Sequence, residues 1–281
     1  MKIVRSPGAI SSLVAAWRRR GETVGFVPTM GALHSAHMSL VRRARASHDR
    51  VVVSVFVNPL QFGPKEDLTK YPRPFAKDAR LCRLEKVDGL YQPTVGAMYP
   101  PGARTFIDVK GLSNRYCGAS RPGHFRGVTT VVAKLLGQVR PNTLFLGQKD
   151  FQQLVIVERM VRDLDLGVKV VGCPIVREKD GLALSSRNMY LSPAQREAAP
   201  LFNASLRKAA TEAKRRGATP ASVLAFARRE LRKIPGSRLD YVALAEVISL
   251  EPAQRLKGRL RLLSAVKFGN TRLIDNIPIL L

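Results

Sequence analysis

The chain has 281 residues, of which 45% are hydrophobic, a composition typical of a soluble protein with one or two globular domains. No apolar run approaches the roughly 20 residues that a membrane span needs. The cysteines, Cys82, Cys117 and Cys173, are too far apart for a metal site, so we expect free thiols in a reducing cytoplasm. The formal net charge of +26 comes from scattered basic residues, and aromatic residues make up only 6%. This balance predicts non-specific attraction to polyanions but not stacking on single strands.

Strand and helix patterns alternate over the first part of the chain. Short apolar runs predict buried strands, and apolar residues three or four apart predict helices. In chain order we expect a strand from Ile3, a helix from Pro7, strand 23–27, helix 34–47, strand 51–57, helix 74–86, strand 89–91, helix 128–139, strand 143–146, helix 152–164 and strand 168–171. This alternation predicts βαβ units and a parallel sheet, with ligands at the carboxyl ends of its strands.

The pattern changes after about Pro174. A polar loop is followed by two helical patterns and then by alternating strands. We expect the loop at 177–188, helices at 193–216 and 220–233, and strands at 241–247, 260–267 and 272–277. The sequence therefore predicts a parallel α/β domain of residues 1–175 and a smaller α+β domain of residues 176–281 that acts as a cover.

The most informative motif is a pair of histidines behind the first buried strand. Pro28 and Gly31 end that strand, and His34 and His37 then stand at the head of a helical pattern. A spacing of three places both imidazoles on one face of the first turn. The unpaired backbone N–H groups and the helix dipole favour an anion there, so the pair predicts a phosphate site. Two polar helix residues without a ligand are the alternative.

Two further polar motifs follow predicted strands. Asn58-Pro59 comes after strand 51–57, and the segment GQKD at 147–150 comes after strand 143–146. The carboxyl ends of parallel strands share one edge of a sheet, so we expect these motifs and the histidine pair to meet there.

Five separate blocks, in this order, resemble the pantoate–β-alanine ligase family, and a terminal block is similar as well. The blocks are PTMGALH at 28–34, FVNPLQF at 56–62, RPGHF at 121–125, GQKDFQQ at 147–153, DGLALSSRN at 180–188 and TRLIDN at 271–276. The resemblance covers nearly the whole chain. It implies a Rossmann-like domain of the nucleotidyl-transferase type with a smaller C-terminal domain.

The resemblance also implies an ATP- and Mg²⁺-dependent reaction in two steps. The pantoate carboxylate attacks the α-phosphate of ATP, which gives pantoyl-adenylate and pyrophosphate. The amine of β-alanine then attacks the acyl carbon and releases AMP. Such chemistry needs positioned donors for the charge that develops on phosphate oxygens. A cytoplasmic homodimer without a membrane partner is implied as well.

Residue roles follow from the same resemblance. The catalytic set comprises His34, His37, Lys149, Ser185, Ser186 and Arg187. Residues expected to contact ATP are Met30, His37, Gly147, Lys149, Asp150, Val176, Leu184, Ser185, Ser186 and Arg187. Residues expected to line the pantoate pocket are Met30, Asn58, Gln61 and Gln153, with Tyr71, Arg121 and His124 close by. Asp78 is the one candidate ligand for Mg²⁺.

The chain departs from the family pattern at a few of these places. Ala36 stands where glycine is usual between the histidines, and Ser35 where an acid is usual. Gln148 and Cys117 stand where glutamate is common, and Lys77 replaces an acid beside Asp78. Fewer carboxylates would weaken the recruitment of Mg²⁺, although phosphate oxygens supply much of its coordination.

Two other functions compete with the ligase. A different adenylyl- or cytidylyl-transferase could use the same histidine signature, but Gln61 and Gln153 argue for a hydroxy acid, because an amide both donates and accepts. A non-catalytic RNA-binding relative would account for the +26 charge and the missing acids, and its RNA binding would fall with salt.

Overall fold

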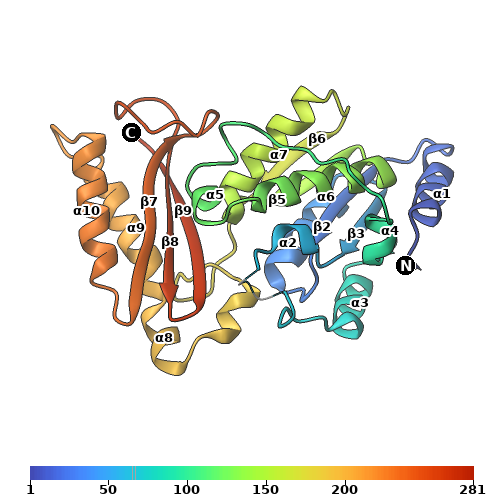
Figure 1. Cartoon of the computed structure of the whole chain (residues 1–281), viewed down its shortest axis with the longest axis horizontal. Coiled ribbons are helices and arrows are strands. Elements are labelled where there is room, and N and C mark those ends of the chain that lie inside the picture. The colour runs from blue at the N-terminus through green and yellow to red at the C-terminus, as the bar shows by residue number, and fades with distance from the viewer. Residues whose placement is uncertain (65, 67) are drawn as a thin grey trace. The chain divides into compact units, whose positions relative to one another are not determined.

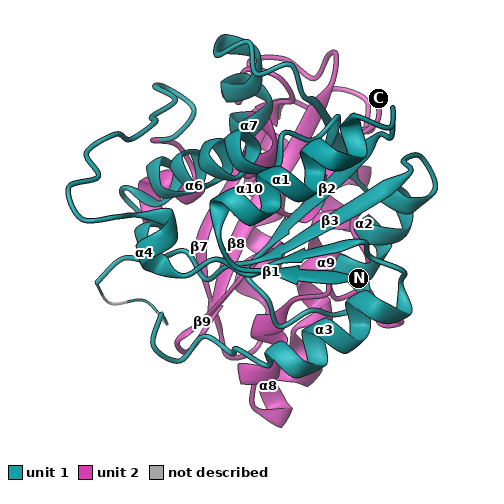
Figure 2. Cartoon of the chain, turned by 90° about the vertical axis from the view of Figure 1, so that its right-hand side faces the viewer, with its two compact units in different colours: residues 1–113, 121–148, 156–174 teal, residues 114–120, 149–155, 175–281 magenta. Residues whose placement is uncertain are grey.

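Figure 1 shows the computed structural model of the chain, which describes residues 1–64, 66 and 68–281. The chain forms two compact units, which Figure 2 distinguishes by colour. Unit 1 comprises Met1–Ser113, Arg121–Gln148 and Ile156–Pro174, and unit 2 comprises Asn114–Ser120, Lys149–Val155 and Ile175–Leu281. The division after Pro174 lies beside the boundary expected at residue 175. Two short segments that we expected in the first domain, 114–120 and 149–155, belong to unit 2 instead.

Unit 1 is built on a six-stranded sheet in which every neighbouring pair is parallel. The strands are β1 (Lys2–Val4), β2 (Val24–Thr29), β3 (Arg50–Val55), β4 (Gly89–Tyr91), β5 (Thr143–Gly147) and β6 (Lys169–Cys173). Their order across the sheet is β1-β4-β3-β2-β5-β6. The strand order reverses between β2 and β5, because β2 leads on to β3 on one side and β5 leads on to β6 on the other. The predicted parallel α/β fold is confirmed.

Helices cover both faces of this sheet (Figure 2). The helices of unit 1 are α1 (Pro7–Arg18), α2 (Ser35–Arg45), α3 (Phe75–Leu84), α4 (Val95–Met98), α6 (His124–Val139) and most of α7 (Phe151–Asp163). Val41 of α2 and Cys82 of α3 pack with Val53 and Leu90 on one face. On the other face α1 and α6 lie side by side, joined by a hydrogen bond from Ser11 Oγ to Gln138 O (2.8 Å). Fully burying such side chains stabilises the fold by about 1.5–3 kcal/mol each.

Unit 2 contains a three-stranded antiparallel sheet and a pair of helices. Its strands are β7 (Ser237–Glu246), β8 (Leu260–Phe268) and β9 (Thr271–Ile279), and its helices are α5 (Cys117–Ser120), α8 (Pro193–Ala198), α9 (Pro200–Glu212), α10 (Pro220–Arg232) and the start of α7. In Figure 1, α9 and α10 lie beside the sheet. Phe202 and Leu206 of α9 and Leu231 of α10 pack there against β8.

Two predicted helices differ from the observed ones. The helix expected at 193–216 is divided into α8 and α9 at Pro200, because proline lacks the N–H that would continue the hydrogen-bond ladder. Helix α6 begins at His124, four residues before the expected start, because Gly123 takes a left-handed conformation (φ 81°) and sets the first turn from there. Among the described residues, no helix is both long and apolar enough to cross a membrane.

Candidate active site

His34 and His37 lie at the amino end of α2, directly behind the carboxyl end of β2. His34 is the residue that precedes the helix, and His37 stands in its first turn. The backbone N–H of His34 donates to Nδ1 of His37 (3.3 Å), and the centroids of the two rings are 4.1 Å apart. Since Nδ1 of His37 accepts, its neutral ring carries the proton on Nε2. The predicted pairing of the two imidazoles is confirmed.

Asp78 fixes the turn that carries these histidines. Its side chain is completely buried, and its two carboxylate oxygens accept from the backbone N–H groups of Ala32 (3.0 Å) and Leu33 (2.8 Å). Burial raises the pKa of Asp78, and the two backbone donors oppose that rise. Both oxygens of Asp78 are thus engaged by the backbone of the histidine turn, and its predicted role as a ligand of Mg²⁺ stays a prediction. Lys77 beside it is exposed.

Three residues expected to bind pantoate are joined within unit 1. Gln61 Nε2 donates to the sulfur of Met30 (2.9 Å), and Asn58 Nδ2 donates to Gln61 Oε1 (3.2 Å). Asn58 is almost fully buried and starts the short 3₁₀ helix Pro59–Gln61, whose Leu60 N–H it caps. Asn58 therefore shapes the loop that carries Gln61.

Helix α6 holds this loop from the other side. Asn58 Nδ2 donates to Gly127 O (3.0 Å), and a Cβ built on Gly127 would lie 2.2 Å from Leu60 O. Only glycine allows the helix to approach the loop so closely. Tyr99, which the sequence did not single out, donates its hydroxyl to Asn58 Oδ1 (2.8 Å).

Arg121 and His124 also act on Gln61, through its backbone. His124 Nδ1 lies 2.8 Å from Gln61 O, and Arg121 donates to the same oxygen (3.1 Å) and to both carboxylate oxygens of Glu66 (2.6 Å each). Arg121 Nη1 lies 3.0 Å from His124 Nε2, so a neutral His124 that donates from Nδ1 accepts from Arg121. Tyr71 is buried, and its ring stacks edge-on against Phe62 (5.9 Å).

Gly147 ends β5, on the other side of the point where the strand order reverses. A Cβ built on it would meet no heavy atom of the described residues within 4 Å. The chain therefore leaves unfilled the space that a side chain would take there. Ligands of open parallel sheets bind at the carboxyl ends of the strands that flank such a reversal. Gln148, which follows, donates to Gly172 O (3.3 Å).

In unit 2, Lys149, Asp150 and Gln153 lie where the chain enters α7. Asp150 is exposed, and Lys149 and Gln153 are half-buried. The backbone oxygen of Lys149 accepts from Asn276 Nδ2 (2.9 Å), so β9 fixes this turn. Gln152 instead serves the fold, because its buried amide accepts from Cys117 N (3.0 Å) and donates to Arg115 O (2.8 Å).

The loop that carries Ser185, Ser186 and Arg187 is pinned to the same strand. Arg177 forms a bidentate ion pair with the buried carboxylate of Asp275 (2.7 and 2.9 Å), and Leu184 N–H donates to Val176 O (3.0 Å). Ser185 Oγ accepts from Arg187 N (3.3 Å) and begins the 3₁₀ helix Ser186–Tyr190.

The terminal block therefore has a structural explanation that the sequence did not give. Asp275 and Asn276 are neighbours on β9, and they hold the loop of Ser185 and the turn of Lys149 respectively. Neither residue was among the predicted site residues. The signal was present in the TRLIDN block, which places a carboxylate and an amide together in a predicted strand.

The predicted residues are divided between the two units. Unit 1 holds Met30, His34, His37, Asn58, Gln61, Tyr71, Arg121, His124 and Gly147, and unit 2 holds Lys149, Asp150, Gln153, Val176, Leu184, Ser185, Ser186 and Arg187. Among the described residues there is no group of three or more His, Cys, Asp or Glu that could hold a metal ion. Cys117, at a position where the family often has glutamate, accepts from Arg272 (3.2 Å).

Comparisons with known proteins agree with this geometry. Residues 2–278 match the model of the family described as pantoate-beta-alanine ligase. The chain is 51% identical to the pantothenate synthetase of Sphingopyxis alaskensis over 99% of its own length and 100% of that protein, and 47% identical to that of Moorella thermoacetica over 99% and 98%.

Solved structures give the same result. The crystal structure of pantothenate synthetase from Thermus thermophilus matches with a TM-score of 0.93 and 47% identity, covering 99% of each chain. The ligase from Francisella tularensis, solved in complex with β-γ ATP and β-alanine, matches with a TM-score of 0.81 and 34% identity over 99% of this chain and 97% of that one. The chain therefore belongs to the pantoate–β-alanine ligase family.

Proposed function

We propose that the chain condenses pantoate with β-alanine in two steps. In the first, a carboxylate oxygen of pantoate bonds to the α-phosphorus of ATP, and pyrophosphate leaves with the electrons of the broken P–O bond. In the second, the amine of β-alanine bonds to the acyl carbon of pantoyl-adenylate, and AMP leaves as the amine loses a proton. The products are pantothenate, AMP and pyrophosphate.

One observation supports this proposal most strongly. The histidine pair stands at the amino end of α2, at the carboxyl end of β2, and β2 flanks the point where the strand order reverses. A helix N-terminus at that point favours an anion, and the Nε2 proton of His37 adds a donor. Donors fixed before the reaction stabilise the charge that develops on phosphate oxygens without reorganisation, which is the main requirement of phosphoryl chemistry.

The pantoate pocket in this proposal is the group of Met30, Asn58 and Gln61. Met30 supplies an apolar wall, and Gln61 supplies an amide that can donate to a carboxylate or accept from a hydroxyl. Asn58, Arg121 and His124 act as positioning residues, because each bonds to Gln61. Gln153, which belongs to unit 2, stays a predicted pantoate contact from the resemblance alone.

The nucleotide would be bound by the residues that the resemblance assigns to it. Lys149 and Arg187 offer positive charge to the phosphates, and Ser185 and Ser186 offer hydroxyls. Gly147 leaves room for the nucleotide, and Asp150 is proposed to accept from the ribose. Asn276 and Asp275 support the proposal, because they fix the backbone on which Lys149 and the serine loop depend.

Mg²⁺ is expected to accompany ATP. Among the described residues no three His, Cys, Asp or Glu side chains are grouped as a metal site, and the two oxygens of Asp78 accept from backbone N–H groups. We propose that Mg²⁺ arrives with ATP, held by phosphate oxygens and water, as is usual for this ion. A homodimeric state remains a prediction from the resemblance.

An assay of AMP release with each substrate omitted in turn tests the proposal. We expect AMP to form only when ATP, pantoate and β-alanine are all present, with pantothenate in equal amount. Release of pyrophosphate with a different acid or phosphate acceptor, and none with pantoate, would favour another nucleotidyl transferase and contradict the proposal.

A further inference from the structure

Helices α9 and α10 form a hairpin that buries one side and exposes the other. The buried side of α9 includes Phe202, Leu206 and Ala209, and that of α10 includes Val223 and Leu231. These side chains pack in the core of unit 2, and α10 and α9 lie beside the strands in Figure 1. The opposite side of both helices faces solvent.

The exposed side of this hairpin is strongly basic. Residues 200–233 contain nine basic residues against Glu212 and Glu230, a net charge of +7 in 34 of the 281 residues. All nine are exposed: Arg207, Lys208, Lys214, Arg215, Arg216, Arg228, Arg229, Arg232 and Lys233. About an eighth of the chain therefore carries more than a quarter of its formal net charge of +26.

The two acidic residues neutralise only part of this charge. Glu230 lies within 4 Å of three cations, Lys233 (2.6 Å), Lys208 (3.4 Å) and Arg229 (3.8 Å). Glu212 pairs with Arg215 (3.1 Å). In the part of the chain that the structure describes, no carboxylate pairs with Lys214, Arg216, Arg228 or Arg232.

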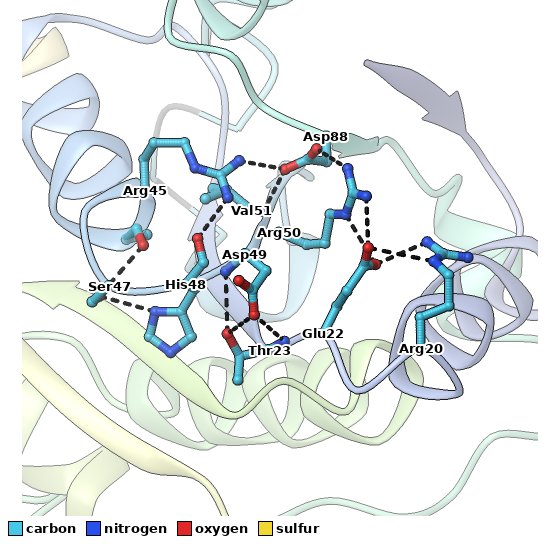
Figure 3. A network of polar contacts seen from close by, with 11 residues as sticks. Arg20, Glu22, Thr23, Arg45, Ser47, His48, Asp49, Arg50, Val51 and Asp88 are labelled. Atoms are coloured by element: carbon cyan, nitrogen blue, oxygen red, sulfur yellow. Dashed lines mark hydrogen bonds and ion pairs between the residues drawn. The ribbon is translucent and has the colours of Figure 1, made fainter.

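One group of basic residues in unit 1 is paired more completely. Figure 3 shows Arg20, Arg45 and Arg50 joined to Glu22 and Asp88 in one network at the amino ends of the strands. Each of these cations contacts a carboxylate, and the network serves the fold. The charge on the α9–α10 hairpin has no comparable set of counter-charges, so it is available to a partner from solution.

The spacing of the cations fits a nucleic-acid duplex. Two adjacent pairs of cations, Arg228-Arg229 and Arg232-Lys233, stand four residues apart on α10. They therefore share one side of the helix and span about 7.5 Å of its axis. Each strand of a DNA duplex carries about one phosphate per 3.4 Å of the axis, so about two phosphates of a facing strand lie within the same length. The ring of Phe226 on α10 is half-buried and has the guanidinium of Arg229 over it (4.8 Å), so that face is not open to an unpaired base.

We propose that the exposed side of the α9–α10 hairpin binds the phosphate backbone of a nucleic-acid duplex, for which a short RNA duplex is the probe. Phosphate contacts of this kind carry no sequence information, so binding is expected to be independent of sequence and sensitive to salt. This inference does not depend on the proposed ligase activity, because none of these residues belongs to the candidate active site.

Charge reversal on α10 tests the proposal with an internal control. The test variant is Arg228→Glu with Arg232→Glu, and the control is Arg80→Glu with Arg83→Glu on α3, two exposed arginines without a paired carboxylate in the described structure. Both variants change the net charge equally. Binding of a short RNA duplex is measured by fluorescence anisotropy between about 50 and 200 mM salt, and AMP release and thermal unfolding are followed in parallel.

We expect the test variant to bind the duplex about tenfold more weakly or worse, with a salt slope smaller by about two, one for each lost phosphate contact. The control is expected to change affinity much less, and both variants to keep their AMP release and unfolding temperature. An equal loss in the control would show that net charge alone attracts RNA. Binding of vesicles rich in anionic lipid by the wild type, with no binding of the duplex, would also overturn the proposal.

Discussion

At the scale of single residues, the candidate site depends on side chains that hold other site residues in place. Asp78 shows this most clearly, because its buried carboxylate fixes the N–H groups of Ala32 and Leu33 just before the histidines. Resemblance alone suggested a metal ligand at this position. Burial and hydrogen bonding, which a sequence does not reveal, show that it also positions the turn.

Replacing Asp78 by asparagine distinguishes these two roles. An amide keeps one acceptor but turns a donor toward a backbone N–H, so Asp78→Asn should lower the free energy of unfolding by about 1–3 kcal/mol. Adenylation should also slow, because the turn that carries His34 loosens. Urea unfolding and the Mg²⁺ dependence of adenylation are measured together. A larger Mg²⁺ requirement with unchanged stability would favour the metal-ligand role and contradict the positioning role.

His37 is expected to act on the reaction itself. If its Nε2 proton stabilises phosphate charge in the transition state, His37→Ala should lower the adenylation rate about 10²-fold or more, the effect of losing one preorganised donor. His48→Ala is the matched control, since His48 contacts Ser47 and Thr143 rather than the candidate site. Single-turnover rates for the two variants decide the matter, and an unchanged rate in His37→Ala would remove this histidine from the mechanism.

At the scale of elements, most of the fold could be predicted from local patterns. Strand 89–91 was predicted with its observed bounds, and β2, β3 and β5 begin within a residue of expectation, because buried strands are near-continuous apolar runs. Helix ends were less predictable, since Gly123 and Pro200 set them through backbone conformation. The first turn of α6 contains few apolar residues, so the sequence there lacks the apolar spacing of three or four that predicts a helix.

Contacts between distant elements could not be predicted from such patterns. The motifs indicated that Met30, Asn58 and Gln61 act together, but not that Tyr99 and Gly127 hold the loop between them. Likewise the pairing of Arg177 with Asp275 joins residues 98 positions apart in the chain. Such pairs arise from tertiary packing, so spacing along the sequence carries no sign of them.

The close approach of α6 to the 3₁₀ helix Pro59–Gln61 predicts a sharp effect of one methyl group. A Cβ on Gly127 would overlap Leu60 O and push the loop, so Gly127→Ala should cost about 1–3 kcal/mol of stability and raise the KM for pantoate. Gly137→Ala on the same helix is the control, because a Cβ there meets no described atom within 4 Å. It should stabilise the helix by up to about 1 kcal/mol.

Chemical denaturation and steady-state kinetics measure both variants. Equal effects of the two alanines would show that the helix approaches the loop less closely than the structure has it.

At the scale of the whole molecule, basic side chains outnumber acidic ones and give a net charge of +26. In the network of Figure 3 each carboxylate therefore contacts more than one cation, since Glu22 and Asp88 together contact Arg20, Arg45 and Arg50. The hydrogen bond from Arg50, followed by that from Arg20, lowers the pKa of Glu22 to about 2.

This shift predicts how stability depends on pH. A carboxylate whose pKa is lower in the folded state stabilises the fold above its unfolded pKa of 4.5, and the contribution disappears as pH falls toward about 2. Glu22→Gln should therefore lower the urea midpoint at pH 7, and the difference from the wild type should shrink below pH 4.5. The effect should be small and sensitive to salt, because the pair is near the surface. A difference that does not vary with pH would contradict this assignment.

Exchange of labelled pyrophosphate into ATP tests the central claim most directly, namely that the chain forms an acyl-adenylate from pantoate. The histidine pair and the pantoate group lie together in unit 1, so the first step should not require β-alanine. We predict exchange when ATP and pantoate are present and β-alanine is absent, and none without pantoate. Synthesis of pantothenate without any such exchange would contradict a reaction that proceeds through released pyrophosphate and pantoyl-adenylate.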